Sequence, residues 1–112
     1  MTPCLFCKII NKEIPSKTIH EDESCIAFHD IAPQAPTHLL IVPRRHIEKT
    51  ADISPQDKEL VGHLHWVASV IARKLKITDF RLVMNNGTEA GQSVWHLHLH
   101  LLGGRPFSWP PG

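Results

Sequence analysis

The strongest constraint on the fold is the alternation in WHLHLHLL, residues 95–102, where histidine occupies positions 96, 98 and 100 and leucine occupies positions 97, 99 and 101. Successive side chains on a strand point to opposite faces. The pattern therefore predicts a strand whose leucines are buried against a helix and whose histidines share the other face. The function of the chain then depends on what three imidazoles on one face can do.

Three explanations of the histidine face remain open on this evidence. A merely solvated face is disfavoured, because strand propensity would place Thr or Val there. Neighbouring positions on one face are about 6.6 Å apart and the outer pair about 13 Å apart, so two of the imidazoles could share a metal but hardly all three. Alternatively one imidazole reacts, since a neutral histidine with a pKa of about 6.5 is a nucleophile near pH 7.

The rest of the chain predicts an α+β domain with an antiparallel sheet. Apolar periodicity and turn residues indicate a helix over 4–14 that ends before Pro15, and a longer helix from Ser54, as N-cap, to about Lys76. The expected strands cover residues 17–20, 24–29, 38–43, 80–86 and 94–102. An order of three strands, a helix and two strands is typical of the α+β class.

Length and composition limit the classes of function. The 112 residues predict one domain, 1–112, and the net charge of +1 gives no field that would attract nucleic acid or an anionic membrane. We see no signal peptide and no apolar run of membrane-spanning length. Three cysteines, including a C-x-x-C pair, favour a reducing compartment, so we expect a cytoplasmic protein.

A glycine-containing loop precedes the histidine strand. In NNGTEAGQSV, Gly87 and Gly91 would let backbone N–H groups converge on an anion, and Ser93 and Asn85 add a hydroxyl and an amide. Most such loops are simply turns. Beside three histidines, however, this loop favours a phosphate ligand.

These residues resemble a known family. Residues 96–102 have the His-φ-His-φ-His-φ-φ form, with φ apolar, of the histidine triad (HIT) superfamily. KIINKEIPSK, CIAFHDIAPQAPTHLLIVPRRHI, GQSV and LLGGRPFSWPPG resemble its Hint branch, the purine nucleoside phosphoramidases. The resemblance implies a five-stranded antiparallel sheet with one long and one short helix, and a homodimer across which the sheets join.

The activity implied by the resemblance is hydrolysis of the P–N bond in purine nucleoside 5′-phosphoramidates, first AMP-linked amines and then GMP-linked ones. His98 would attack the α-phosphorus, and His100, His96, His38 and Ser93 would assist. The residues implied in nucleotide binding surround the phosphate, the ribose or the base. They are Phe6, Ile9, Phe28, His29, Asp30, Ile31, Asn85, Gly91, Gln92, Ser93, Val94 and Trp109.

Several of these residues also have simpler explanations. Phe6, Ile9 and Phe28 could belong to a plain core. Asp30, which would bind both ribose hydroxyls, could cap a turn. Trp109, which would reach the partner's site, could be an interface anchor.

A metal site is also implied by the resemblance. Some members of the superfamily bind zinc with an N-terminal C-x-x-C and two histidines, which correspond to Cys4, Cys7, His46 and His96. A Cys₂His₂ set suits a closed structural site, so catalysis would need no cofactor. The alternative is two free thiols on a helix.

Three other functions remain open. One is hydrolysis of dinucleoside polyphosphates, although the ending LGGRPFSWPPG argues against it. The second is a nucleotide-binding or scaffold protein with incidental hydrolysis. The third is a zinc hydrolase whose metal is catalytic.

Overall fold

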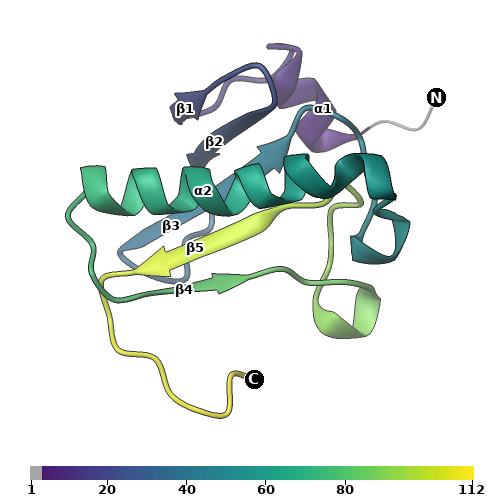
Figure 1. Cartoon of the computed structure of the whole chain (residues 1–112). Coiled ribbons are helices and arrows are strands. Elements are labelled where there is room, and N and C mark those ends of the chain that lie inside the picture. Colours follow the sequence, from purple (N-terminus) through teal and green to yellow (C-terminus); the bar gives the residue numbers. More distant parts are fainter. Residues whose placement is uncertain (1–3) are drawn as a thin grey trace.

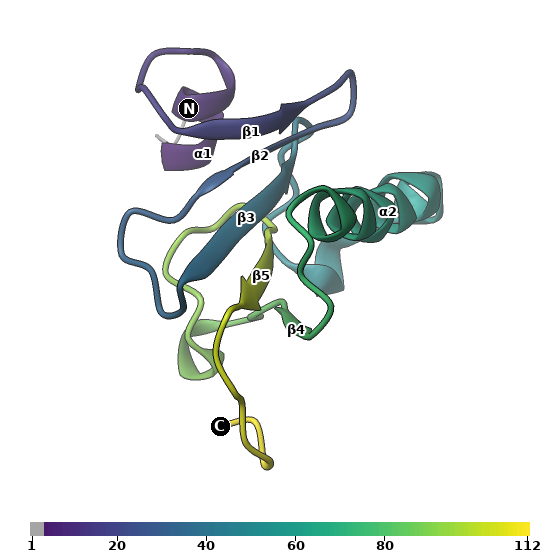
Figure 2. The same cartoon turned by 90° about the vertical axis from the view of Figure 1, so that its left-hand side faces the viewer.

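The computed structural model describes residues 4–112 as a five-stranded antiparallel sheet with a helix on each face (Figures 1 and 2). The strands lie in the order β1-β2-β3-β5-β4. Their bounds are β1, Thr18–Glu21; β2, Cys25–His29; β3, Thr37–Pro43; β4, Phe80–Val83; and β5, Leu99–Gly103. This architecture confirms the predicted α+β class.

The long helix α2, Lys58–Lys74, follows the predicted start signal with one difference. Ser54 and Asp57 form a capping box, but Pro55–Asp57 is a 3₁₀ turn, so the α-helix proper begins at Lys58. The helix ends at Lys74, two residues before Lys76, whose φ of 58° is left-handed and incompatible with continuing the helix. Two further 3₁₀ turns cover Thr50–Asp52 and Thr88–Ala90.

The short helix α1, Leu5–Ile10, is shorter than predicted. It ends at Ile10 because Lys12 takes a left-handed φ of 64° and turns the chain toward β1. Figure 2 shows α1 beside β1 and β2, with α2 on the other side of the sheet. Neither helix in residues 4–112 has the length and apolar character that crossing a bilayer requires.

One hydrophobic core lies on each face of the sheet. The larger contains Leu97, Leu99 and Leu101 packed with α2, as the alternation predicts. The smaller lies under α1, where Phe6 and Ile9 contact the opposite face of β2 and β3. Because side chains alternate along each strand, the histidine face is the one that α1 covers.

The last strand begins at Leu99, whereas the sequence predicted a start at residue 94. In the register that pairs Ile41 with Leu99, Pro43 would lie opposite Leu97, and proline has no N–H for a ladder. The Leu97 N–H instead donates to the Ile47 carbonyl at 2.6 Å. Similarly, β4 stops at Val83 rather than residue 86, because β5 pairs with it only as far as His100.

Asp22 connects the turn between β1 and β2 to α2. Its Oδ2 accepts hydrogen bonds from His20 Nε2 at 2.7 Å and from His63 Nε2 at 2.8 Å. Its Oδ1 accepts the backbone N–H groups of Ser24 and Cys25. Burial alone would raise the pKa of Asp22, but these hydrogen bonds together hold it well below its ordinary value of 3.8.

We expect Asp22→Asn to lower the free energy of unfolding by about 2 kcal/mol at pH 6, because charge-assisted hydrogen bonds are lost. The native pKa of Asp22 is lowered, so its contribution is present above pH 3.8 and is lost as the pH falls below that value. Urea unfolding of both proteins between pH 3 and pH 7 checks this. A difference that does not shrink toward the acid end would contradict it.

Candidate functional site

A cavity of about 1000 Å³ opens where α1, the β2–β3 loop and β5 meet. It brings together eleven of the residues predicted for nucleotide binding or catalysis. They are Phe6, Ile9, Phe28, His29, Asp30, Ile31, His38, Ser93, Val94, His98 and His100.

His98 presents one nitrogen to this cavity in a defined tautomer. Its Nδ1 lies 2.7 Å from the His96 carbonyl oxygen. A carbonyl only accepts, so Nδ1 carries the proton and Nε2 keeps a free lone pair. Burial lowers the pKa of His98 and so favours the neutral ring, while the carbonyl opposes this shift. The ring packs edge-on against Phe6, with centroids 4.9 Å apart.

His100 presents a donor rather than a lone pair, because a chain of hydrogen bonds fixes its tautomer. The Gln34 N–H donates to His38 Nδ1 at 3.0 Å, so the proton of a neutral His38 is on Nε2. His38 Nε2 then donates to His100 Nδ1 at 2.9 Å, which leaves the His100 proton on Nε2. Within the described residues His100 Nε2 is buried without a partner. An unpartnered buried N–H of this kind suits an anionic oxygen.

The surroundings of His38 and His100 keep both imidazole rings neutral. Burial lowers the pKa of His100 to about 4, assisted by His98 and His38. Burial also lowers the pKa of His38, although Asp30 opposes it. Neutral rings preserve the relay from the Gln34 N–H to His100 Nε2 at pH 7.

Asp30 caps a turn and lines the cavity as well. Its Oδ1 accepts the Ala32 N–H at 2.8 Å, and its Oδ2 lies 3.5 Å from His38 Nε2. Capping a turn therefore does not prevent Asp30 from facing a ligand in the cavity, so the two roles considered from sequence are compatible. The rest of the carboxylate's acceptor capacity is available to a ligand hydroxyl.

The loop before β5 is shaped by Gln92, whose side chain is buried inside it. Gln92 Oε1 accepts the Gly87 N–H at 2.9 Å, and Nε2 donates to the carbonyls of Glu48 and Val94. Gly91 has a left-handed φ of 99°, which favours glycine. The Gln92 side chain thus supports the loop rather than lining the cavity.

Other predicted residues also lie outside the cavity lining. Asn85 and Gly91 are close to each other within the connection between β4 and β5, and a Cβ on Gly91 would be 3.7 Å from the Asn85 amide nitrogen. Trp109 is 83% exposed, in the C-terminal segment. Figure 1 shows that segment running away from the sheet beyond β5.

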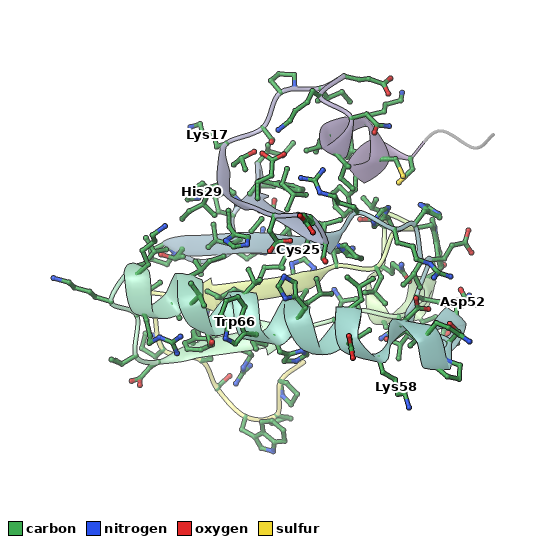
Figure 3. The ribbon with its side chains drawn as sticks, turned by 45° about the horizontal axis from the view of Figure 1, so that its top comes forward. Lys17, Cys25, His29, Asp52, Lys58 and Trp66 are labelled. Atoms are coloured by element: carbon green, nitrogen blue, oxygen red, sulfur yellow. The ribbon has the colours of Figure 1, made fainter. Side chains whose placement is uncertain are left out.

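Sequence reasoning missed Lys17, which lines the cavity and is labelled in Figure 3. It is the one lysine or arginine among the described residues of the lining. A lysine just before a short edge strand resembles any solvated charge, so the sequence carries no signal for it. The same holds for Gln34, which acts through its backbone N–H.

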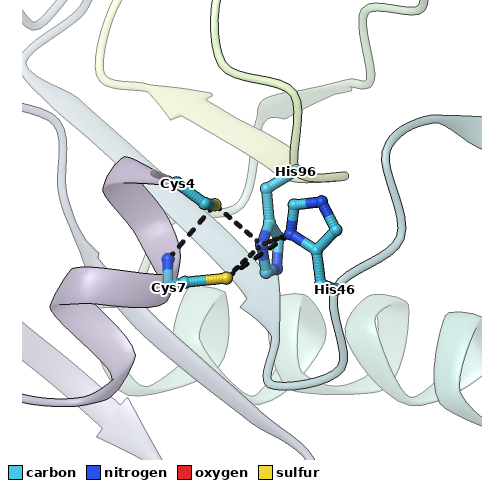
Figure 4. Close-up of side chains that lie close together, drawn as sticks. All are labelled: Cys4, Cys7, His46 and His96. Carbon is cyan, nitrogen blue, oxygen red and sulfur yellow. Dashed lines mark hydrogen bonds between the residues drawn. The ribbon is translucent and has the colours of Figure 1, made fainter. Parts of the chain in front are cut away.

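A second group of side chains lies outside the cavity lining. It consists of Cys4, Cys7, His46 and His96, whose ligand atoms lie close together (Figure 4). His96 Nε2 lies 2.8 Å from the Pro43 carbonyl and donates to it, which leaves the lone pair on Nδ1. This Nδ1 lies 3.3 Å from Cys4 Sγ, 3.5 Å from Cys7 Sγ and 3.1 Å from His46 Nδ1. Cys7 Sγ lies 3.4 Å from His46 Nδ1.

These distances fit a tetrahedral ion. Zn–N bonds of about 2.05 Å and Zn–S bonds of about 2.3 Å require about 3.4 Å between two nitrogens and about 3.5 Å between a nitrogen and a sulfur. Each observed separation agrees to within a few tenths of an ångström. A third cysteine, Cys25, is fully buried in the core under α2 and lies outside this group (Figure 3).

Comparisons with known proteins identify the family and the fold. The HIT domain family matches residues 11–107. An uncharacterized HIT-like protein of Synechocystis is 53% identical over 109 residues, which is 96% of each chain. The crystal structure of a HIT family hydrolase from Legionella pneumophila superposes with a TM-score of 0.94 at 48% identity, covering 98% of this chain and 100% of that one. A histidine triad nucleotide-binding protein from Candida albicans gives a TM-score of 0.82 at 32% identity, with 96% and 83% covered.

Proposed function

This chain belongs to the HIT domain family, and we propose that it is a nucleotide hydrolase of the Hint branch that cleaves the P–N bond of purine nucleoside 5′-phosphoramidates. The observation that carries the proposal is the pairing of a free lone pair on His98 Nε2 with an unpartnered N–H on His100 Nε2 at one cavity. A nucleophile beside a fixed donor is what attack on a phosphorus centre requires. The relatives described as a hydrolase and a nucleotide-binding protein support the general class.

In the first step His98 Nε2 forms a bond to the α-phosphorus and the P–N bond to the amine breaks. The His98 ring then carries a positive charge, which the hydrogen bond from Nδ1–H to the His96 carbonyl stabilises. His100 Nε2–H donates to a non-bridging phosphoryl oxygen. The departing nitrogen takes the electron pair together with a proton that solvent supplies through the Ser93 hydroxyl, because an amide anion is too basic to leave unprotonated.

In the second step a water molecule attacks the phosphorus, the bond to His98 Nε2 breaks, and one proton of the water returns to solvent. The products are the nucleoside monophosphate and the neutral His98 ring in its original tautomer. Splitting the reaction in this way replaces one difficult displacement by two easier ones.

The purine would lie against Phe28, Phe6, Ile9 and Ile31, which belong to the apolar part of the cavity lining. Ile31 is 97% exposed, a position suited to covering one face of a planar base. The ribose hydroxyls would reach Asp30, and Lys17 adds a positive charge near the cavity mouth.

Asp30→Ala is expected to weaken binding of AMP by about tenfold, since hydrogen bonds to a charged group are lost. Affinity for 2′-deoxy-AMP should change much less. The two dissociation constants are measured for both proteins by calorimetry. Equal affinity of the unaltered protein for the ribo and deoxy ligands would remove the proposed role of Asp30.

The donor set of Cys4, Cys7, His46 and His96 is proposed to hold a structural Zn²⁺. Four protein ligands close the coordination sphere, so no position is left for a water or a substrate. Zinc held there would supply a cross-link between α1, the segment after β3 and the segment that precedes β5. This arrangement disfavours the alternative of a catalytic zinc.

We further propose a homodimer. β4 lies at an edge of the sheet, and Trp109 is exposed and does not line the cavity. Both features suit a partner that continues the sheet and receives Trp109. Sedimentation equilibrium should give twice the 12.7 kDa of one chain.

Turnover separates the candidate functions. With adenosine 5′-phosphoramidate as substrate we expect multiple turnovers and release of AMP. Preference for diadenosine polyphosphates instead would favour the dinucleotide hydrolase. Tight binding of AMP without turnover of either substrate would favour a binding protein.

A further inference from the structure

Helix α1 and its N-cap contribute side chains to two different sites, the four-donor group and the cavity. Cys4 and Cys7 point toward His46 and His96, as Figure 4 shows. Phe6 and Ile9 line the cavity. A single turn of backbone therefore carries both the metal donors and a wall of the proposed purine pocket.

The stability of α1 depends on tertiary contacts. The helix has only six residues, and helices shorter than about 12 residues are marginal without tertiary contacts. Cys4 is its N-cap, and the Cys7 N–H donates to Cys4 Sγ at 3.3 Å. The same sulfur is thus part of the cap and of the donor set, so the group that binds there also fixes the first turn of α1.

Phe6 connects α1 to the segment before β5 that carries His96 and His98. Its ring lies 4.9 Å from the His98 ring, 6.0 Å from the His96 ring and 5.6 Å from the Phe28 ring, measured between centroids. His96 in turn holds His98 through its carbonyl oxygen. The position of Phe6 relative to His98 is therefore set from both ends by residues of, or adjacent to, the four-donor group.

Among the four donors, His46 allows the role of the donor set to be distinguished from direct contact with the cavity. It lies after β3 and is exposed, and it neither lines the cavity nor belongs to the apolar core under α1. Its contact with α1 is the 3.4 Å approach of Nδ1 to Cys7 Sγ. Any influence of His46 on nucleotide binding has to pass through the donor set.

We propose that metal bound by Cys4, Cys7, His46 and His96 is a determinant of purine affinity, because it fixes α1 and so the Phe6 and Ile9 wall against which the base is held. His46 is then a positioning residue for the base. This inference rests on the proposed function, since it takes the cavity to be the nucleotide site.

The effect is specific to the base. Ribose 5-phosphate would use Asp30, His98 and His100 but would not reach the wall formed by Phe6 and Ile9. Loss of the metal should therefore weaken AMP binding and leave ribose 5-phosphate binding nearly unchanged. A general loosening of the protein would weaken both ligands alike.

The test compares the wild-type protein, His46→Ala and His65→Ala, each after addition of zinc and measurement of bound metal. His65 is an exposed histidine on α2 and serves as the matched control. For His46→Ala we expect the dissociation constant of AMP to rise about tenfold, on the scale of ordering two side chains, with that of ribose 5-phosphate within about twofold. The His65→Ala protein should match the wild type, and removing zinc from the wild type should reproduce His46→Ala.

A second readout needs no nucleotide. Amide hydrogen exchange at Lys8 and Asn11, whose N–H groups donate to the Cys4 and Cys7 carbonyls, should become faster in His46→Ala. Equal AMP affinity in His46→Ala and wild type, equal weakening of both ligands, or no zinc in the wild type would overturn the inference. Failure of every form to bind AMP, with α1 exchange still dependent on zinc, would instead overturn the proposed function on which the inference rests.

Discussion

His98→Asn is expected to lower turnover of adenosine 5′-phosphoramidate by about 10⁴-fold or more, the scale seen when a nucleophile is removed. Asparagine offers no basic nitrogen that can attack phosphorus, while it keeps a donor that can reach the His96 carbonyl. AMP should still bind, because Asp30, His100 and the apolar wall are unchanged. Steady-state rates and equilibrium binding of AMP, measured on the same preparation, check both parts.

His65→Asn is the matched control, an equivalent change on the exposed face of α2. It should leave turnover within about twofold of the wild type, as expected of a surface substitution. Residual turnover of more than a few per cent in His98→Asn would rule out covalent attack by this residue. Direct attack by water, assisted by His100, would then be the simpler mechanism.

Removing the structural zinc that we propose is expected to have the largest effect on stability. When free zinc exceeds its dissociation constant about 1000-fold, binding stabilises the folded state by about 4 kcal/mol. For a domain of this size that corresponds to a fall in Tm of about 15 °C on removal of the metal. Differential scanning calorimetry with added zinc and with a chelator measures it.

The double substitution Cys4→Ser and Cys7→Ser isolates the metal from the helix cap. Serine at position 4 can still accept the N–H of residue 7, so the cap is kept while both thiolate donors are lost. The variant should have the low Tm of the metal-free wild type and should no longer respond to chelator. At a temperature where the metal-free protein is folded and at saturating substrate, turnover should persist, and its complete loss there would indicate a catalytic metal.

Some features of the fold were predictable because they are local. The alternation of residues 96–101 places leucines and histidines on opposite faces whatever the rest of the chain does. The Ser54 signal gave the start of α2 to within a 3₁₀ turn. The start of β5 at Leu99, rather than at residue 94, was not predictable from the strand itself. It depends on Pro43, which lies in a different strand.

The chemistry of the site was less accessible from sequence. The tautomers of His98 and His100 depend on a carbonyl and on the Gln34 N–H, which no residue pattern specifies. The approach of Cys7 to His96 joins residues 89 positions apart, and only the family resemblance suggested it. The resemblance implies that Gln92 binds the nucleotide, yet its side-chain amide makes hydrogen bonds that hold the loop before β5.

The proposed mechanism requires a covalent bond between His98 and the nucleotide. Rapid-quench mass spectrometry of the protein mixed with adenosine 5′-phosphoramidate can detect this bond. We expect a transient adduct with the mass of an adenylyl group, formed and lost at rates consistent with turnover and mapped to His98 by peptide fragmentation. Full turnover with no adduct at any quench time, or an adduct on another residue, would contradict covalent catalysis by His98.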